Sequence, residues 1–476
     1  MNTENLTIEN FENYFNDIAE IIFRYRDNLD QEPIIPSVGY SELYEAFNKE
    51  LPYNGAAIED LLTEVKEKIV PNSSKVGHPR FLAWMNNAGC DAGFLGDLIN
   101  AGLNQNPFMY KAGPAATVIE DIVVQWMGKL FGYSGGFGGT LVSGGTTANL
   151  TALLVAREAK AGNTMIDGIG QGAKLLLYMS EQGHTTIERA IGILGIGTGN
   201  IRKIPTDDQF RMDVKALEIQ IRNDLADNYQ PFCVVAQGGS ANVGSVDPID
   251  PIAAICRKYD LWLHVDAAYG GAAILSQSKK YLFQGIEQAD SITVDPHKWF
   301  YIPTEAGLVL IKDREKLYDT FTKTSCKAYK GNNTETNFLD YGLQLARTSR
   351  AIKVWFAFKT YGFEKIGKCV EQNIILANEL KNRFANEPGW EILNPVSLSV
   401  VCLRYVPDSM TDTNRINDLQ GVILKRLEES GKAFLTPVAI NGKNGIRICF
   451  ANHRTTLNDV DILHEALTSV VKVRHC

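Results

Sequence analysis

Residues 261–271 read LWLHVDAAYGG, and this stretch shows the pattern on which the fold depends. An apolar run ends at an acidic residue, Asp266, and small residues follow it, Ala268 among them. Such a run is typical of a strand that is buried on both faces, as in a parallel sheet covered by helices. A carboxylate at its end is costly to bury unless it meets a cation or a hydrogen-bond donor. We therefore expect Asp266 to face a binding site at the edge of a sheet, with room for a flat group beside it.

Similar apolar runs recur on both sides of this stretch and alternate with segments of helical spacing. Strands are predicted at 174–180, 231–237, 261–268, 291–295 and 306–313, and helices at 185–195 and 250–260. This alternation predicts an α/β protein whose mostly parallel sheet is flanked by helices.

The pattern differs toward both ends of the chain, which predicts three units. Residues 1–95 look mostly helical, residues 96–370 form the large α/β domain, and residues 371–476 read as a small C-terminal α+β domain. A chain of 476 residues is long enough for more than one core.

Composition excludes several classes of protein. The net charge of -8 argues against nucleic acid as the main partner, and no apolar run reaches the length of a membrane-spanning helix. The N-terminus lacks the pattern of a signal peptide, so we expect a cytoplasmic protein without a membrane partner. The eight cysteines form no C-x-x-C pair and have no histidine at ligand spacing, so we expect no metal.

Loops that follow strands carry the candidate chemistry, because ligands of open parallel sheets bind beyond the carboxyl ends of the strands. In LVSGGTTANLTALLVAR (141–157), a Gly-Gly pair and two threonines precede a helix, which favours a phosphate. In SEQGHTTIERA (180–190), His184 lies between a strand and a helix. Taken singly, the first loop reads equally as a plain strand-to-helix turn and His184 as a capping residue.

Another such loop lies in SITVDPHKWFYIP (291–303), where Lys298 follows a predicted strand. A partly desolvated lysine has a lowered pKa and can attack carbonyl groups as a free amine. Alone, Lys298 reads as a surface lysine. Together, the phosphate cup, the imidazole, the buried Asp266 and the amine are what pyridoxal 5'-phosphate needs: a phosphate anchor, a stacking partner, a partner for the pyridine nitrogen and a Schiff-base lysine.

Four motifs also carry a resemblance: HVDAAYGG (264–271), DPHKW (295–299), GGTTANLTALLVAR (144–157) and LQLARTSRAIKVWFAFKTYG (343–362). They resemble the group II pyridoxal-phosphate-dependent amino-acid decarboxylases, the family of the aromatic-L-amino-acid, histidine, tyrosine and glutamate decarboxylases. The likeness extends from residue 75 to the C-terminus. It implies the fold type I architecture of pyridoxal-phosphate enzymes and a homodimer in which the N-terminal helices wrap over the partner.

The resemblance also implies roles for individual residues. Lys298 would hold the cofactor, Asp266 would pair with the pyridine nitrogen, and His184 would stack on the ring opposite Ala268. The remaining cofactor-binding candidates are Gly145, Thr146, Thr147, Ser240, Asp295 and His297. The chain departs from the family where QGGSAN (237–242) replaces the usual GTTN run, although Ser240 keeps the hydroxyl.

The expected reaction is decarboxylation of an L-amino acid to the amine and CO2. Tyr329, in the loop FTKTSCKAYKGNNTETNF (321–338), is the candidate proton donor. An aromatic or other apolar substrate is indicated by the aromatic residues Phe81, Trp84, Phe108 and Tyr110. The candidate substrate residues are Phe81, Trp84, Asn87 and Asn106. Aromatic residues that pack a dimer interface would look the same.

Several alternatives remain. They are aldehyde synthase, lyase or aminotransferase activity, an aliphatic or acidic substrate, and a non-catalytic relative. An aminotransferase would bind the substrate carboxylate with an arginine of the C-terminal unit, where Arg404 and Arg447 are present.

Overall fold

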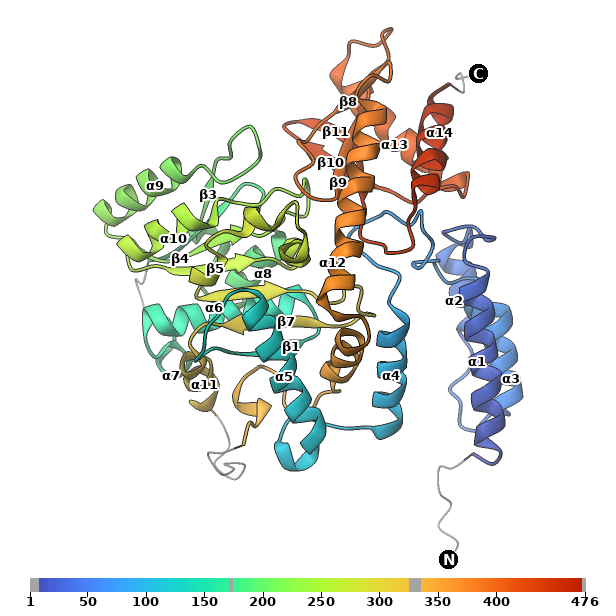
Figure 1. Ribbon diagram of the computed structural model, residues 1–476, viewed down its shortest axis with the longest axis horizontal. Helices are drawn as coiled ribbons and strands as arrows, with labels where there is room; N and C mark the ends of the chain where they lie inside the picture. Colours follow the sequence, from blue (N-terminus) through green and yellow to red (C-terminus); the bar gives the residue numbers. More distant parts are fainter. Residues whose placement is uncertain (1–7, 171–173, 325–334, 473–476) are drawn as a thin grey trace, which may run out of the picture.

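A seven-stranded sheet lies at the centre of the computed structural model, which describes residues 8–170, 174–324 and 335–472 (Figure 1). Its strands are β1 (Gly138–Val142), β2 (Leu175–Ser180), β3 (Ile201–Ile204), β4 (Gln230–Gln237), β5 (Trp262–Asp266), β6 (Ser291–Val294) and β7 (Gly307–Ile311), in the order β1-β7-β6-β5-β4-β2-β3. Strand β7 runs antiparallel to β1 and β6, and all other pairs are parallel. Each predicted strand overlaps one of these, so the mostly parallel sheet is confirmed.

Helices cover both faces of this sheet, as the pattern of fully buried strands requires. They are α5 (Pro114–Leu130), α6 (Gly145–Ala161), α7 (Thr164–Asp167), α8 (Thr185–Ile193), α9 (Val214–Ala226), α10 (Ile249–Lys258) and α11 (Arg314–Thr322). Leu176 joins the core under α5, α9 and α10, whereas its neighbour Leu177 joins the core under α6, α8 and α11. The sheet is therefore the middle layer of three.

A second sheet forms the small C-terminal unit. Its strands are β8 (Trp390–Ile392), β9 (Val400–Tyr405), β10 (Thr436–Ile440) and β11 (Lys443–Cys449), all antiparallel, in the order β10-β11-β9-β8. Its helices are α12 (Arg350–Phe384), α13 (Thr413–Glu429) and α14 (Leu457–Lys472). Helix α12 breaks at Gly362 (φ 66°) and touches β1 of the first sheet as well as β8 and β9, so the domain boundary predicted at residue 370 falls within a shared helix.

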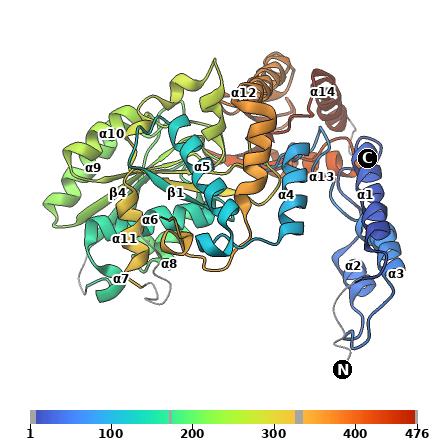
Figure 2. The same cartoon turned by 60° about the horizontal axis from the view of Figure 1, so that its bottom comes forward.

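The N-terminal residues are helical, with α1 (Phe11–Asp27), α2 (Tyr40–Phe47) and α3 (Ile58–Glu64), which a π-helical turn extends over Val65–Ile69. These helices project as an arm beside the body in both views (Figures 1 and 2), whereas α4 (Asp91–Leu103) packs on α12. The arm carries many exposed apolar side chains, including Phe11, Phe23, Tyr40, Leu51 and Tyr53. No helix in the described parts of the chain has the length and hydropathy of a membrane span.

Candidate active site

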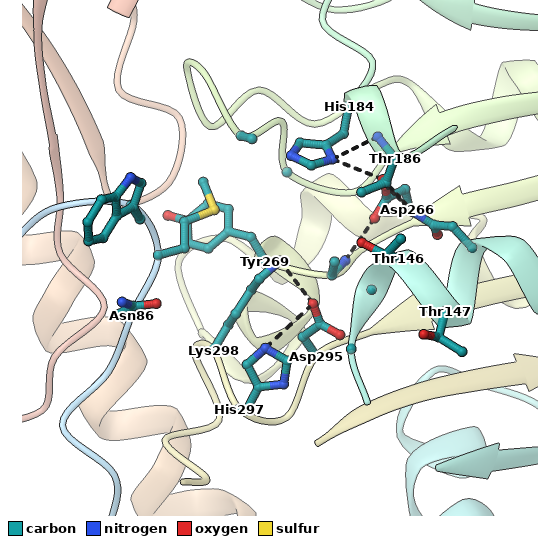
Figure 3. Close-up of a pocket in the computed structure, with 18 of the residues that line it drawn as sticks. Asn86, Thr146, Thr147, His184, Thr186, Asp266, Tyr269, Asp295, His297 and Lys298 are labelled. Carbon is teal, nitrogen blue, oxygen red and sulfur yellow. Dashed lines mark hydrogen bonds and ion pairs between the residues drawn. The ribbon is translucent and has the colours of Figure 1, made fainter. Parts of the chain in front are cut away.

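A cavity of about 490 Å³ opens at the carboxyl ends of the parallel strands. The loops after β1, β2, β4, β5 and β6 converge there, because these five strands point the same way. They contribute Ser143, His184, Gln237, Asp266 and Asp295, among others. Residues 84–86 and Arg447 of β11 also line the cavity, so the small C-terminal unit closes a site that the large sheet opens. Asn86 lies on the side of the cavity away from Thr147 (Figure 3).

Lys298 projects into this cavity and pairs with Asp295 at its base (Figure 3). The Nζ atom lies 2.9 Å from Asp295 Oδ2, and the lysine side chain is 27% exposed while that of Asp295 is 2% exposed. Burial alone would lower the pKa of Lys298, but the charge and the hydrogen bond of Asp295, with help from Asp266, outweigh burial and raise it. The expectation of a lowered pKa is therefore wrong for this structure, because it counted desolvation and left out the ion pair.

His297 lies beside the start of α6. Ala306 donates its N–H to His297 Nδ1 (3.0 Å), and a Cβ added at Gly144 would lie 3.2 Å from His297 Cε1. Burial lowers the pKa of His297, so the ring is neutral at pH 7. Nδ1 also lies 2.7 Å from the carbonyl oxygen of Ala306, which can only accept, so these two contacts fix the position of the ring and not its tautomer.

The first turn of α6 forms a floor that fits a phosphate. The N–H groups of Gly145, Thr146 and Thr147 have no carbonyl four residues earlier in the helix, and the helix dipole favours negative charge at this end. A Cβ at Gly145 would lie 2.8 Å from Asp295 Oδ2 and 3.3 Å from the Cβ of Ala268. Glycine therefore keeps this floor open. Ser143 adds a hydroxyl, whose oxygen lies 2.9 Å from that of Thr147.

Asp266 is almost fully buried at the end of β5, and among the described residues it is held by hydrogen bonds and not by a contacting cation. Asn149 Nδ2 donates to Asp266 Oδ2 (2.9 Å), and the backbone N–H of Ala268 donates to Oδ1 (3.2 Å). Across the cavity, His184 caps α8 and accepts at Nδ1 from the backbone N–H of Thr186 (3.2 Å). Burial lowers the pKa of His184, so this ring is also neutral at pH 7.

The structure brings most of the sequence-predicted residues to one cavity. Those that line it are Trp84, Gly145, Thr146, Thr147, His184, Asp266, Ala268, Asp295, His297 and Lys298. These residues come from separate loops that meet at the carboxyl ends of the parallel strands, where the sequence predicted a binding site.

Four predicted residues do not line the cavity. Ser240 is fully buried, with its hydroxyl oxygen 2.9 Å from that of Ser245, and Phe81 packs behind Trp84 with ring centroids 6.0 Å apart. Asn87 donates to the carbonyl oxygens of His297 and Ile302, and Asn106 accepts from the backbone N–H of Arg347 (3.2 Å). These side chains support the walls from behind. Tyr329 lies outside the described residues.

Sequence reasoning missed several lining residues. Among them are Asn149, Thr186, Gln237 and Tyr269. Gln237 and Thr186 could have been found, because one ends a predicted strand and the other follows His184. Arg447 also lines the cavity, and the sequence offered it, with Arg404, only as an arginine that an aminotransferase could use. Its Nη2 donates to the carbonyl oxygen of Trp84 (2.7 Å), while its buried Nε has no hydrogen-bond partner among the described residues.

These groups fit pyridoxal 5'-phosphate. The N–H groups at the start of α6 offer donors for a phosphate, with His297 beside them. Lys298 offers an amine, and Asp266 offers a buried carboxylate for a ring nitrogen. Within the described residues, no cluster of three His, Cys, Asp or Glu side chains could hold a metal ion.

Comparisons with known proteins point the same way. Residues 41–406 match the family model described as "Pyridoxal-dependent decarboxylase conserved domain". The chain is 33% identical to the aromatic-L-amino-acid decarboxylase of Bacillus atrophaeus, over 93% of this chain and 91% of that one. It is 31% identical to the 4-hydroxyphenylacetaldehyde synthase of Rhodiola rosea, over 95% of this chain and 94% of that one. The crystal structure of mouse CSAD superposes with a TM-score of 0.92 at 25% identity, covering 98% of this chain and 99% of that one.

Proposed function

This chain belongs to the pyridoxal-dependent decarboxylase family, and from that premise we propose that its substrate is an L-amino acid with an aromatic or other apolar side chain. The enzyme is a pyridoxal-phosphate-dependent carboxy-lyase, which releases CO2. The observation that carries the substrate class is the composition of the cavity, which Trp84, Met85 and Tyr269 line together with Lys298 and one arginine, Arg447.

The roles of the cofactor-binding residues follow from their chemistry. Lys298 attaches the cofactor, and Asp266 pairs with the ring nitrogen and keeps it protonated. The first turn of α6 (Gly145, Thr146, Thr147) and His297 hold the phosphate. His184 and Ala268 flank the ring. These roles are supported by the free N–H groups of α6, the Lys298 amine and the Asp266 carboxylate, which all line the same cavity. Ser240 remains a candidate through its motif alone, because its hydroxyl is engaged by Ser245.

When bound, pyridoxal phosphate supplies a ring that withdraws the electrons released as CO2 leaves. The residues of the chain must then orient the bond that breaks. Arg447 lines the cavity, and its buried Nε has no hydrogen-bond partner among the described residues. Its guanidinium group can hold the substrate carboxylate, with Trp84 fixed beside it through its carbonyl oxygen. A site that excludes water favours the loss of a charged carboxylate. An arginine of this kind suits an aminotransferase as well, so it does not decide between the two activities.

An apolar substrate side chain is favoured by what surrounds Trp84. Its ring packs edge-on against Phe434 with centroids 5.4 Å apart. The backbone of Trp84 is in the left-handed region (φ 51°). A second substrate carboxylate would need another cation. Among the described lining residues, the permanent cations are Lys298, which pairs with Asp295, and Arg447. An acidic side chain would thus lack a partner.

A panel of the twenty amino acids tests this proposal. We expect CO2 and the matching amine from aromatic substrates, with weaker release from aliphatic ones. CO2 release confined to glutamate or aspartate would contradict the apolar-pocket argument. Transfer of the amino group to a keto acid without CO2 release would favour the aminotransferase.

Tyr329 is our candidate for the proton donor to the substrate Cα, on the strength of its place in the sequence. Aldehyde synthase activity is the second candidate function, since a relative of that name is 31% identical to this chain. We expect the wild-type protein to yield amine without hydrogen peroxide, and Tyr329→Phe to yield aldehyde. Unchanged amine output from Tyr329→Phe would rule out this role.

A homodimer is the assembly we propose, because the arm formed by α1–α3 leaves large apolar side chains in solvent. Sedimentation velocity should find two chains per particle. Phe23→Asp should weaken that association, whereas Ile219→Asp, a similarly exposed position on α9, should not. A monomeric wild-type protein would contradict the proposal.

A further inference from the structure

A line of hydrogen bonds runs through the core from β6 to the floor of the cavity. Trp262 Nε1 lies 2.8 Å from Ser291 Oγ, which lies 2.8 Å from His264 Nδ1. His264 Nε2 lies 3.0 Å from Asn149 Oδ1, and Asn149 Nδ2 lies 2.9 Å from Asp266 Oδ2. All five side chains are buried, and the first three do not line the cavity.

The direction of every bond in this line is fixed by its two ends. The indole N–H of Trp262 can only donate, so Ser291 Oγ accepts and its own proton goes to His264 Nδ1. A neutral imidazole that accepts at Nδ1 carries its proton on Nε2 and donates it to Asn149 Oδ1. Burial lowers the pKa of His264 to about 4, so the ring is neutral at pH 7. The line ends at a carboxylate, which only accepts.

A branch of the same line reaches the opposite wall. Asn149 Nδ2 also lies 3.1 Å from Thr186 Oγ1, which lies 2.9 Å from His184 Nδ1. Since Asn149 donates to this oxygen, the hydroxyl proton of Thr186 is free to go to His184. The neutral His184 ring then carries its own proton on Nε2.

We propose that Asn149 and His264 are positioning residues, which hold the Asp266 carboxylate in place and set the tautomer of His184. The inference rests on the proposed role of Asp266 as the partner of the ring nitrogen. His264 is required because an asparagine amide can turn over. With Oδ1 turned toward Asp266, two oxygens without protons would face each other, and the N–H of His264 would face an N–H2 group.

The donor of Asn149 matters because no cation among the described residues contacts the buried Asp266. A buried carboxylate is stabilised by the hydrogen bonds it accepts, and bonds to a charged group are the stronger ones. The described donors to Asp266 are Asn149 Nδ2 and the backbone N–H of Ala268. Loss of the first would leave Asp266 Oδ2 without a described donor, so the carboxylate would no longer be held where a ring nitrogen can pair with it.

The variant that tests this is Asn149→Asp, matched by Asn394→Asp as a control. Asn394 is a buried asparagine that donates to the carbonyl oxygens of Val243 and Val400 and accepts from the N–H of Cys402, away from the cavity. Both substitutions replace a buried donor by a carboxylate, so both should lower the melting temperature. We expect Asn149→Asp alone to weaken cofactor binding about 10- to 100-fold and to alter the pH dependence of the bound cofactor's absorption band.

A second measurement needs neither cofactor nor variant enzyme activity. In 15N-histidine-labelled protein, we expect the His264 signal to report an unprotonated Nδ1 and a protonated Nε2 at pH 7, with His264→Gln identifying the signal. The opposite tautomer would overturn the inference. So would an Asn149→Asp protein that binds the cofactor as the wild type does, or one that differs from it no more than Asn394→Asp. Failure of the wild-type protein to bind the cofactor would instead contradict the proposed function, and the tautomer would still decide the inference.

Discussion

At the scale of single residues, the ion pair between Lys298 and Asp295 decides how the site is charged. A lysine that is merely desolvated would be a free amine near neutral pH, but Asp295 keeps this one as an ammonium ion. The lysine is thereby held in place, since its Nζ is fixed against a buried carboxylate. The amine becomes nucleophilic when its proton moves, and Asp295 is the contacting group that governs this step.

Asp295→Asn should therefore lower the pKa of Lys298, because the negative charge that outweighs the effect of burial is removed. The amine would be unprotonated over a wider pH range. We expect the pH profile for the rate of cofactor association to move to lower pH in this variant. A profile that stays in place or moves to higher pH would show that Asp295 does not control the ammonium.

At the scale of elements, close packing against two neighbouring loops requires a glycine at the start of α6. Gly145 has room for a hydrogen atom and no more, since Asp295 and Ala268 approach from the adjoining loops. Close packing also requires a glycine in β1, the strand before α6. A Cβ at Gly139 would lie 2.4 Å from the carbonyl oxygen of Val309, so β1 can approach β7 because it carries glycine.

Gly145→Ala should weaken cofactor binding about tenfold, because the new methyl group must displace Asp295 from the floor of the phosphate site. Binding of inorganic phosphate should weaken with it. Gly421→Ala is the control, since a Cβ in this exposed part of α13 meets nothing within 4 Å and should raise the free energy of unfolding by about 0.5–1 kcal/mol. Equal cofactor affinity in the wild type, Gly145→Ala and Gly421→Ala would contradict the placement of the phosphate.

At the scale of the whole molecule, two buried histidines link stability to pH. Burial lowers the pKa of His78 and of His264 to about 4. The unfolded chain binds these protons near pH 6.5, so stability is complete above pH 6.5 and falls as pH drops toward 4. Each histidine should remove about 3 kcal/mol by pH 4. The urea midpoint should fall between pH 7 and pH 5, and His78→Asn should fall less. A midpoint independent of pH would contradict the buried neutral rings.

The sequence predicted the sheet and the reactive residues better than it predicted their surroundings. Apolar runs revealed five of the seven strands, but β1 (Gly138–Val142) and β3 (Ile201–Ile204) were not predicted, and no run shows that β7 is antiparallel. Lys298, Asp266 and His184 were found because each follows a strand. Asn149 was missed, and Arg447 could not be placed in the site, because their contacts depend on how α6 and the second sheet pack. Ser240 matched a motif, but its hydroxyl faces Ser245.

The central claim is that Lys298 carries the cofactor in a site shared with Asp266. It is tested most directly by reducing the cofactor-loaded protein with borohydride, digesting it and locating the pyridoxyl group by mass spectrometry. We predict a single modified peptide that contains Lys298, and no modification in Lys298→Arg. A pyridoxyl group on another lysine, or on none, would contradict the account.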